Sequence, residues 1–304
     1  MKSKKIITAE LIALAVLLIL FGIGIFSKSK ANNQNIDSGE NTEQESLQQT
    51  MPQDLENNEL GELTVTFFDV GKGDCILIEA TQGNIMIDTG YEENGEDIVS
   101  WLGDNGIDTL DYLILTHPDK DHIGGADIVI NNINVINIID TNCVVDTQDY
   151  LEYKQAALDQ GIDILTLTST KEIELGGVKL TIYPPLSTDY AGQNDYSLVT
   201  KMIYGETDYL FAADAEEARI AEMLKQIPNI KSMLLKVPYH GALKDNSEEF
   251  FEAVAPQYSI ITCDKKKMYE DVTKMLQKLN SEVFTTKQGD ITVKSDGNTM
   301  TISQ

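Results

Sequence analysis

The pattern of hydrophobic and polar positions divides the chain into three parts. Residues 2–5 are rich in lysine, and residues 11–26 then follow without a single charge, so that a helix there would be apolar on every face. Residues 27–60 are dominated by Asn, Gln, Glu and Ser, and this composition predicts a flexible linker because ordering it would bury little apolar surface. Residues 61–304 contain recurring apolar runs and amphipathic stretches, which predict the folded domain.

The first part, residues 1–26, is expected to be a signal-anchor or transmembrane segment. Its apolar run is just long enough to cross a bilayer, and the lysines before it favour an N-terminus inside the cell. A signal peptide cleaved near residue 31 is the alternative and would give a secreted protein, but the small-residue cleavage site there is weak. The expected location is therefore the cell membrane, crossed once, with the C-terminal domain outside.

Short runs typical of strands recur through the folded part, several of them bounded by Gly or Asp turns. They lie at residues 63–70, 75–80, 84–88, 111–116, 178–183, 197–204, 209–213, 233–237, 258–262, 283–286, 291–294 and 299–303. Helical patterns lie between them at residues 96–103, 150–160, 215–227, 247–255 and 269–279. Strands and helices interleave but several hairpins are adjacent, which favours two sheets covered by helices over a doubly wound sheet.

Composition and charge restrict the classes of protein to consider. Hydrophobic residues make up 42% of the chain, enough to bury a core and to argue against wholesale disorder. The 49 acidic and 23 basic residues give a net charge of −26, which argues against a surface that coats nucleic acid broadly but allows a local metal site. The three cysteines, Cys75, Cys143 and Cys263, are too few for a disulfide framework and are expected in the core.

Two of the three histidines lie in one hexapeptide that directly follows the apolar strand pattern at residues 111–116. The segment reads His-Pro-Asp-Lys-Asp-His, and its possible metal donors are His117, Asp119, Asp121 and His122. Imidazole and carboxylate groups are donors that suit zinc, iron or manganese. A charged loop or a capping histidine is the structural alternative, but this density of donors favours a metal site.

At this segment the sequence resembles the HxHxDH signature of the metallo-β-lactamase superfamily and, more narrowly, the soluble hydrolase domain of ComEC-type competence proteins. Further motifs follow in the family's order, at residues 67–74 (FFDVGKGD, resembling F-L-D-V-G-Q-G-D), 87–90 (IDTG), 194–199 (NDYSLV, resembling N-x-x-S-L-V), 213–216 (ADAE, resembling G-D-x-E) and 236–241 (KVPYHG, resembling K-V-P-H-H-G). The resemblance covers about residues 63–303. It implies an α+β fold, a four-layer αββα sandwich with metals at one edge between the sheets.

The resemblance also implies a set of metal ligands and the residues that act in catalysis. The implied ligands are His117 and Asp119 for a first metal, Asp121, His122 and His240 for a second, and Asp214 as a bridge. Two zinc ions are the expected cofactors, with manganese as the alternative. Asp121, Asp214 and His240 are the expected catalytic residues. A helix N-cap at Asp214 and a turn position at His240 are the structural alternatives.

The chain departs from the family pattern around the first metal. Asp119 replaces the second histidine of the signature, and Tyr239 replaces the first histidine of the H-H-G pair. A third imidazole for the first metal is not found, and Asn194 and Ser197 fall near its place. The first site is therefore expected to be rich in oxygen donors and weaker. In addition, Asp69, Asp74 and Asp88 are expected either to orient the ligand loops or to serve as turn residues.

The expected function is hydrolysis of a phosphodiester, with DNA as one candidate, or of another ester outside the membrane. A metal-bound water, which loses its proton near neutral pH, would be the attacking group, and Lys244 or Tyr239 are candidate helpers. A complete competence transporter would carry many hydrophobic spans, whereas this sequence has one at most. Two alternatives stay open: a catalytically degenerate member that serves as a surface binding module, and a lactone or β-lactam hydrolase. The sequence does not predict an oligomeric state.

Overall fold

The computed structural model describes residues 60–304, except for the side chain of Lys266. Within this range no helix combines the length and the apolar character needed to cross a bilayer. The membrane segment expected at residues 1–26 lies outside the described residues, as does the linker expected at residues 27–60 apart from its last residue.

Eight strands form the first sheet, in the order β15-β14-β1-β2-β3-β4-β5-β6. They are β1 (Leu63–Phe67), β2 (Cys75–Ala80), β3 (Gly83–Thr89), β4 (Thr109–Leu115), β5 (Asn134–Thr141), β6 (Ile164–Leu167), β14 (Ile291–Ser295) and β15 (Met300–Ser303). Strands β3 to β6 pair in parallel, whereas the remaining pairs are antiparallel. Parallel neighbours need crossover connections, and these contain α1 (Gly95–Asp104), α3 (Ala126–Asn132) and α4 (Gln148–Gln160).

Seven strands form the second sheet, in the order β13-β12-β11-β10-β9-β8-β7. They are β7 (Lys171–Leu175), β8 (Val178–Tyr183), β9 (Val199–Tyr204), β10 (Thr207–Phe211), β11 (Leu234–Lys236), β12 (Tyr258–Ile261) and β13 (Glu282–Thr285). Strands β7 to β10 are antiparallel and β10 to β13 are parallel. The parallel half again carries its crossovers as helices, α5 (Glu217–Gln226), α6 (Ser247–Val254) and α7 (Lys266–Lys278).

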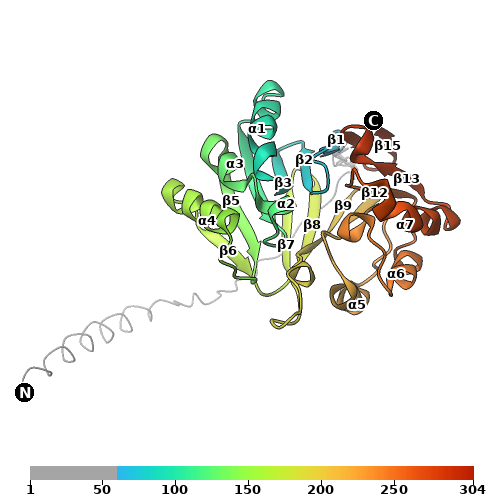
Figure 1. Cartoon of the computed structure of the whole chain (residues 1–304). Helices are drawn as coiled ribbons and strands as arrows, with labels where there is room; N and C mark the ends of the chain where they lie inside the picture. Colours follow the sequence, from blue (N-terminus) through green and yellow to red (C-terminus); the bar gives the residue numbers. More distant parts are fainter. Residues whose placement is uncertain (1–59) are drawn as a thin grey trace, which may run out of the picture. The chain divides into compact units, whose positions relative to one another are not determined.

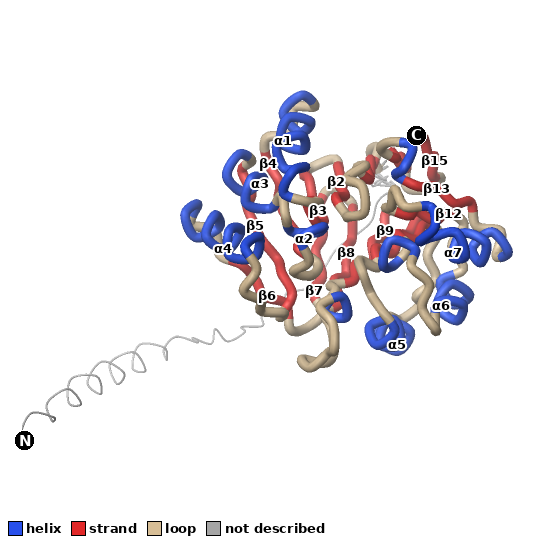
Figure 2. Tube along the Cα trace, viewed as in Figure 1, coloured by secondary structure: helices blue, strands red, loops and turns tan. Residues whose placement is uncertain are grey.

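The two sheets pack face to face, and helices cover the outer face of each (Figures 1 and 2). Apolar side chains from both sheets, such as Phe67 and Phe211, fill the space between them. A second apolar cluster packs α1, α3 and α4 on the first sheet, and a third packs α5, α6 and α7 on the second. This two-sheet sandwich confirms the architecture predicted from the interleaved helices and strands.

The three cysteines are buried and free, as predicted. Cys75 packs in the cluster beneath the helices of the first sheet, and Cys263 packs in the cluster beneath the helices of the second. Burial raises the pKa of the Cys75 thiol well above its usual value, so this residue behaves as a small apolar side chain.

Candidate metal centre

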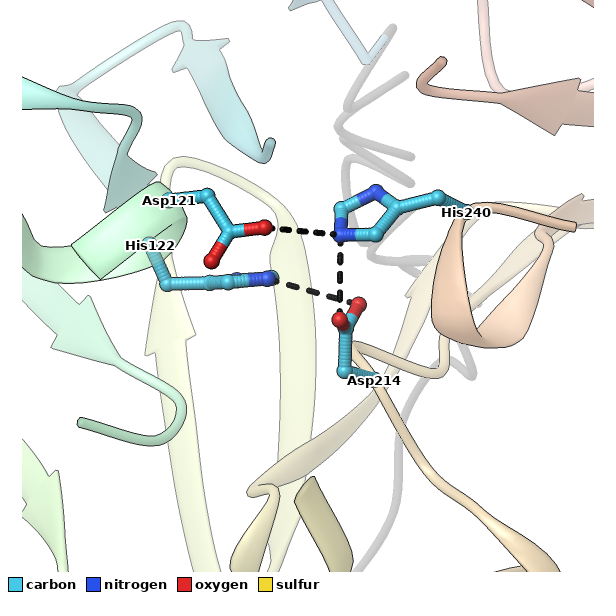
Figure 3. A group of neighbouring side chains, drawn as sticks. All are labelled: Asp121, His122, Asp214 and His240. Carbon is cyan, nitrogen blue, oxygen red and sulfur yellow. Dashed lines mark ion pairs between the residues drawn. The ribbon is translucent and has the colours of Figure 1, made fainter. Parts of the chain in front are cut away.

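Three loops that follow strands converge at one edge of the sandwich (Figure 3). The loop after β4 carries His117 and leads into the short helix α2 (Lys120–Ile123), which contains Asp121 and His122. The loops after β10 and β11 carry Asp214 and His240. The parallel strands β10 and β11 present their carboxyl ends at the same edge of the second sheet, and the loop after β4 reaches this place from the first sheet.

Asp121, His122, Asp214 and His240 form the central cluster, in which one donor atom from each residue lies within 4.8 Å of the others. Nε2 of His240 is 3.0 Å from Oδ2 of Asp214 and 3.6 Å from Oδ2 of Asp121. Nε2 of His122 is 3.3 Å from Oδ1 of Asp214. All four side chains are buried and point toward a common centre (Figure 3). The structure thus brings together four of the six ligands that the resemblance implies.

His117 and Asp119 lie beside the central cluster. The ring centroid of His117 is 4.1 Å from that of His122, and its Nε2 is 3.8 Å from Oδ2 of Asp119. His117 is buried, whereas the Asp119 side chain is 35% exposed. Asp119 stands at the N-cap position of α2 but makes no capping hydrogen bond with its side chain. Its carboxylate therefore does not cap the start of the helix and lies near His117 instead.

Hydrogen bonds determine which ring nitrogen of His122 and His240 carries the proton. Nδ1 of His240 lies 2.9 Å from the carbonyl oxygen of Thr262, which can only accept, so this nitrogen donates. Nδ1 of His122 lies 2.8 Å from the carboxylate of Asp88, which accepts in the same way. In the neutral form of each ring, Nε2 therefore keeps a lone pair directed at the cluster.

His117 is oriented through a second hydrogen bond to the same aspartate. The hydroxyl of Thr116 donates to Asp88 at 2.7 Å, so its oxygen accepts from Nδ1 of His117 at 3.1 Å. Among the described residues, Nε2 of all three histidines is buried and makes no hydrogen bond, although those of His122 and His240 lie at ion-pair distance from Asp214. Buried imidazole nitrogens whose other ring nitrogen is already engaged are donors that suit a divalent metal ion.

Two of the three aspartates expected to orient ligand loops or to serve as turn residues contact the ligands or their supports. Asp88 does so as described above, and Asp74 accepts a hydrogen bond of 2.6 Å from the hydroxyl of Thr262, whose carbonyl holds His240. Asp69 has the other role, because it is exposed and accepts from the backbone N–H of Gly71 at 3.2 Å. Asp74 directly precedes β2 and Asp88 lies within β3, and both are buried, whereas Asp69 lies in an exposed turn.

A fully buried lysine, Lys236, supports the cluster from inside the sandwich. Its ammonium forms an ion pair with Asp74 and donates a hydrogen bond of 2.9 Å to the carbonyl of Ala213. The same ammonium lies 3.6 Å from Oδ1 of Asp214. The sequence placed Lys236 in a motif but gave no sign of these contacts, which depend on strands β2 and β11 of different sheets.

The turn between β1 and β2 adds a second lysine, Lys72, which contacts Asp121 of the cluster. Its Nζ lies 2.5 Å from Oδ2 of Asp121. The turn is fixed against α2 because the backbone N–H of Asp74 donates to the carbonyl of Asp121 at 3.1 Å. Gly73 permits this approach, since a Cβ there would lie 2.5 Å from the same carbonyl oxygen. The glycine therefore lets the turn pack closely against α2 beside the cluster.

The charges in the cluster depend on one another. Burial raises the pKa of Asp214, but His240 and His122 outweigh this effect and hold that pKa well below its usual value. Burial lowers the pKa of His122, but Asp214 and Asp88 hold it well above its usual value. Burial and the neighbouring charge of His122 both lower the pKa of His117, which therefore stays neutral near pH 7.

The backbone around the ligands adopts conformations that cost free energy. Asp88, Ala213, Tyr239 and His240 all have φ between 48° and 58°, in the left-handed region that non-glycine residues rarely occupy. Such strain persists where surrounding contacts over-determine the geometry, and it is common at functional sites.

The alternative role considered for Asp214, the N-cap of a helix, is not the one observed. The helix α5 begins after Glu216, so Asp214 is not its N-cap.

The remaining residues named from the sequence lie around the cluster. Ser197 accepts a hydrogen bond of 3.2 Å from the backbone N–H of Asp214, and Asn194 donates to Glu216 at 2.7 Å. The ammonium of Lys244 lies 4.3 Å from the ring centroid of Tyr239. Asn194 and Ser197 thus support neighbouring residues. In the described part of the chain, His240 is the one further imidazole near His117 and His122.

Comparison with known proteins adds three findings. The family model described as "Metallo-beta-lactamase superfamily" matches residues 68–263. The chain is 30% identical over 246 residues to "ComE operon protein 3" of Bacillus subtilis (strain 168), covering 74% of this chain and 32% of that protein. It is 24% identical over 218 residues to "Competence protein ComA" of Neisseria gonorrhoeae, covering 71% of this chain and 29% of that protein. The chain therefore spans about a third or less of the length of these curated relatives.

A solved structure supports the same fold. The metallo-β-lactamase fold protein YhfI from Bacillus subtilis superposes with a TM-score of 0.56 at 11% sequence identity. The match covers 77% of this chain and 100% of that chain. At this level of identity the likeness concerns the fold alone.

Proposed function

Because the chain belongs to the metallo-β-lactamase superfamily, we propose that it is a metal-dependent hydrolase whose buried cluster holds a divalent metal ion. The observation that carries this proposal is the set of three buried Nε2 atoms without a hydrogen-bond partner among the described residues. Carboxylates of the cluster add anionic oxygen donors beside them. This combination fits a dication, since imidazole nitrogens and carboxylate oxygens replace the water that the ion loses on binding.

Each of the six ligands has a proposed place. Asp121, His122, Asp214 and His240 would hold one ion, and His117 with Asp119 would hold a second, with Asp214 shared between the two. We propose zinc for the imidazole-containing cluster. Manganese suits the His117–Asp119 position better, because carboxylate oxygens are the donors that it favours.

A bound divalent ion would supply Lewis-acid chemistry, because it lowers the pKa of water and stabilises negative charge on a substrate oxygen. The chain's own residues supply position and charge. Asp121, Asp214 and His240 are the residues that we assign to catalysis, since Nε2 of His240 lies 3.6 Å from Oδ2 of Asp121 and 3.0 Å from Oδ2 of Asp214. Asp88 orients His122 directly and His117 through Thr116, and the burial of all these groups excludes bulk water.

The substrate that we propose is a phosphodiester, with DNA as one candidate, or another ester. The support is the resemblance to ComEC-type hydrolase domains over about residues 63–303, together with the similarity to "ComE operon protein 3" and "Competence protein ComA". The proposed location outside the membrane depends on the apolar run at residues 11–26, which lies outside the described residues.

Metal analysis combined with an ester assay tests the proposal. The full chain is loaded with Zn²⁺ or Mn²⁺, dialysed, analysed for bound metal and assayed with bis(p-nitrophenyl) phosphate and with DNA oligonucleotides. We expect stoichiometric metal and hydrolysis that falls by about 100-fold or more in Asp214→Asn. Folded protein that binds no metal would leave the binding-module alternative, and metal-loaded protein that hydrolyses neither substrate would contradict the proposed phosphodiester hydrolysis.

A further inference from the structure

The two lysines at the cluster differ in how firmly they are held. Lys236 is fully buried and is held by both Asp74 and the carbonyl of Ala213. The Lys72 side chain is 23% exposed, and its one hydrogen-bond acceptor within residues 60–304 is Asp121. Lys236 is therefore a fixed part of the core, whereas the ammonium of Lys72 can leave without breaking any other hydrogen bond.

Lys72 and the central cluster share one carboxylate oxygen. Oδ2 of Asp121 lies 2.5 Å from Nζ of Lys72 and 3.6 Å from Nε2 of His240. A dication held between Asp121 and His240 would therefore stand close to a positively charged ammonium. In a partly buried site this repulsion is screened far less than it is in water.

The main chain of Lys72 cannot withdraw to relieve this repulsion. The hydrogen bond from Asp74 N–H to the Asp121 carbonyl, with the close approach of Gly73, fixes the turn to α2. The side chain, in contrast, is free to turn away from Asp121, because it is 23% exposed and no other hydrogen bond within residues 60–304 holds it. The ring centroid of Tyr239 lies 5.8 Å from Nζ, and an aromatic face attracts an ammonium.

We propose that Lys72 is a tethered counter-ion that competes with the divalent metal for Asp121 and thereby sets the metal affinity of the central cluster. This inference rests on the proposed function, because it requires the cluster to bind a metal ion. In the metal-free protein Lys72 neutralises Asp121 and keeps the carboxylate in place. When the ion enters, the ammonium leaves Oδ2 and moves toward Tyr239 at the edge of the site.

Zinc affinity measured by competition with a chromophoric chelator tests this role on the full chain. Lys72→Gln removes the charge but keeps a polar side chain of similar length, and we expect it to bind Zn²⁺ about 10- to 100-fold more tightly than the unmodified chain. Lys72→Arg keeps the charge and should stay within about threefold. Lys179→Gln is the matched control: it removes an exposed lysine that pairs with Glu174 on the surface, and its affinity should also stay within about threefold.

A second readout does not depend on bound metal. In the metal-free state, Lys72→Gln should have a lower melting temperature than the unmodified chain because Asp121 loses its partner, and added Zn²⁺ should raise that temperature by more than it does in the unmodified chain. Unchanged or weaker zinc binding in Lys72→Gln would overturn the counter-ion role while leaving the proposed function intact. Folded protein that binds no zinc in any variant would overturn the proposed function itself.

Discussion

The carboxylate of Asp88 lies 2.8 Å from Nδ1 of His122 and fixes the direction in which this imidazole presents Nε2 to the cluster. The same carboxylate accepts hydrogen bonds from the backbone N–H and the hydroxyl of Thr116, and Thr116 in turn holds His117. One buried aspartate thus orients two of the three histidines. Asp88 itself has a φ of 58°, a left-handed backbone conformation that costs free energy in a non-glycine residue.

Asp88→Asn should weaken metal binding while leaving the donor atoms of the cluster in place. An asparagine has a single acceptor oxygen, and its amide group would face Nδ1–H of His122 or Thr116 donor to donor. We expect the affinity for Zn²⁺ to fall by about 10- to 100-fold in a chelator competition. Asp69→Asn is the control, because Asp69 is exposed and its side chain accepts a hydrogen bond only within its own turn. Equal losses in both variants would contradict an orienting role for Asp88.

Lys236→Met should destabilise the fold strongly, because it leaves the buried carboxylate of Asp74 without its cationic partner. We expect the free energy of unfolding to fall by about 3–5 kcal/mol in urea denaturation. Lys294→Met is the control, since its ion pair with Glu62 joins side chains that are 50% and 61% exposed. That pair should contribute about 1 kcal/mol or less. A similar, small loss in both variants would show that the buried pair does not support the fold.

The sequence predicted strands well where an apolar run ends at clear turns, and less well elsewhere. The predictions at residues 75–80 and 178–183 match β2 and β8 to the residue. Strands β5, β6 and β7 were missed. The cause is visible in β5, which has Asn134 and Asn137 among its residues, and in β7, whose polar residues alternate with apolar ones over only five positions. These strands depend on neighbours in the sheet, which local pattern does not contain.

The candidate site shows the same division between local and long-range information. The hexapeptide from His117 to His122 is a local signal, and the motifs around Asp214 and His240 identified the distant members of the cluster. The contacts of Lys72 with Asp121 and of Lys236 with Asp74 join segments that are far apart in the chain. Charge and spacing alone do not predict such pairs, because the sequence around each lysine is equally compatible with an exposed side chain. Only the packing of the two sheets brings the lysine to its partner.

His117 should make the metal-free protein less stable as the pH falls from 7 to 5.5, whereas His122, whose folded-state pKa is raised, acts in the opposite direction. Burial, together with the charge of His122, holds the folded-state pKa of His117 well below its unfolded value. A group with a depressed pKa stabilises the fold above its unfolded pKa, near 6.5, and this contribution is lost as the pH falls below that value, because only the unfolded chain takes up the proton.

The matched comparison is with His117→Gln, which cannot titrate. We expect the free energy of unfolding of the unmodified chain to fall by about 1 kcal/mol more than that of His117→Gln between pH 7 and pH 5.5. Urea denaturation in the presence of a chelator at each pH measures this difference. Parallel pH profiles for the two proteins would mean that His117 takes up a proton in the folded state as readily as in the unfolded chain.

Divalent metal should stabilise the fold through the central cluster and not through acidic groups on the surface. A ligand at 100 times its dissociation constant contributes about 2.7 kcal/mol, which corresponds to a rise in melting temperature of about 5–10 °C for a domain of this size. We expect this rise on adding Zn²⁺ to the chelator-treated chain, and we expect His240→Ala to abolish it. Glu92, Asp149 and Glu152 form another carboxylate group, on the surface. Glu152→Gln should therefore keep the full rise in melting temperature. If this rise were lost in Glu152→Gln but kept in His240→Ala, the stabilising ion would lie at the surface group.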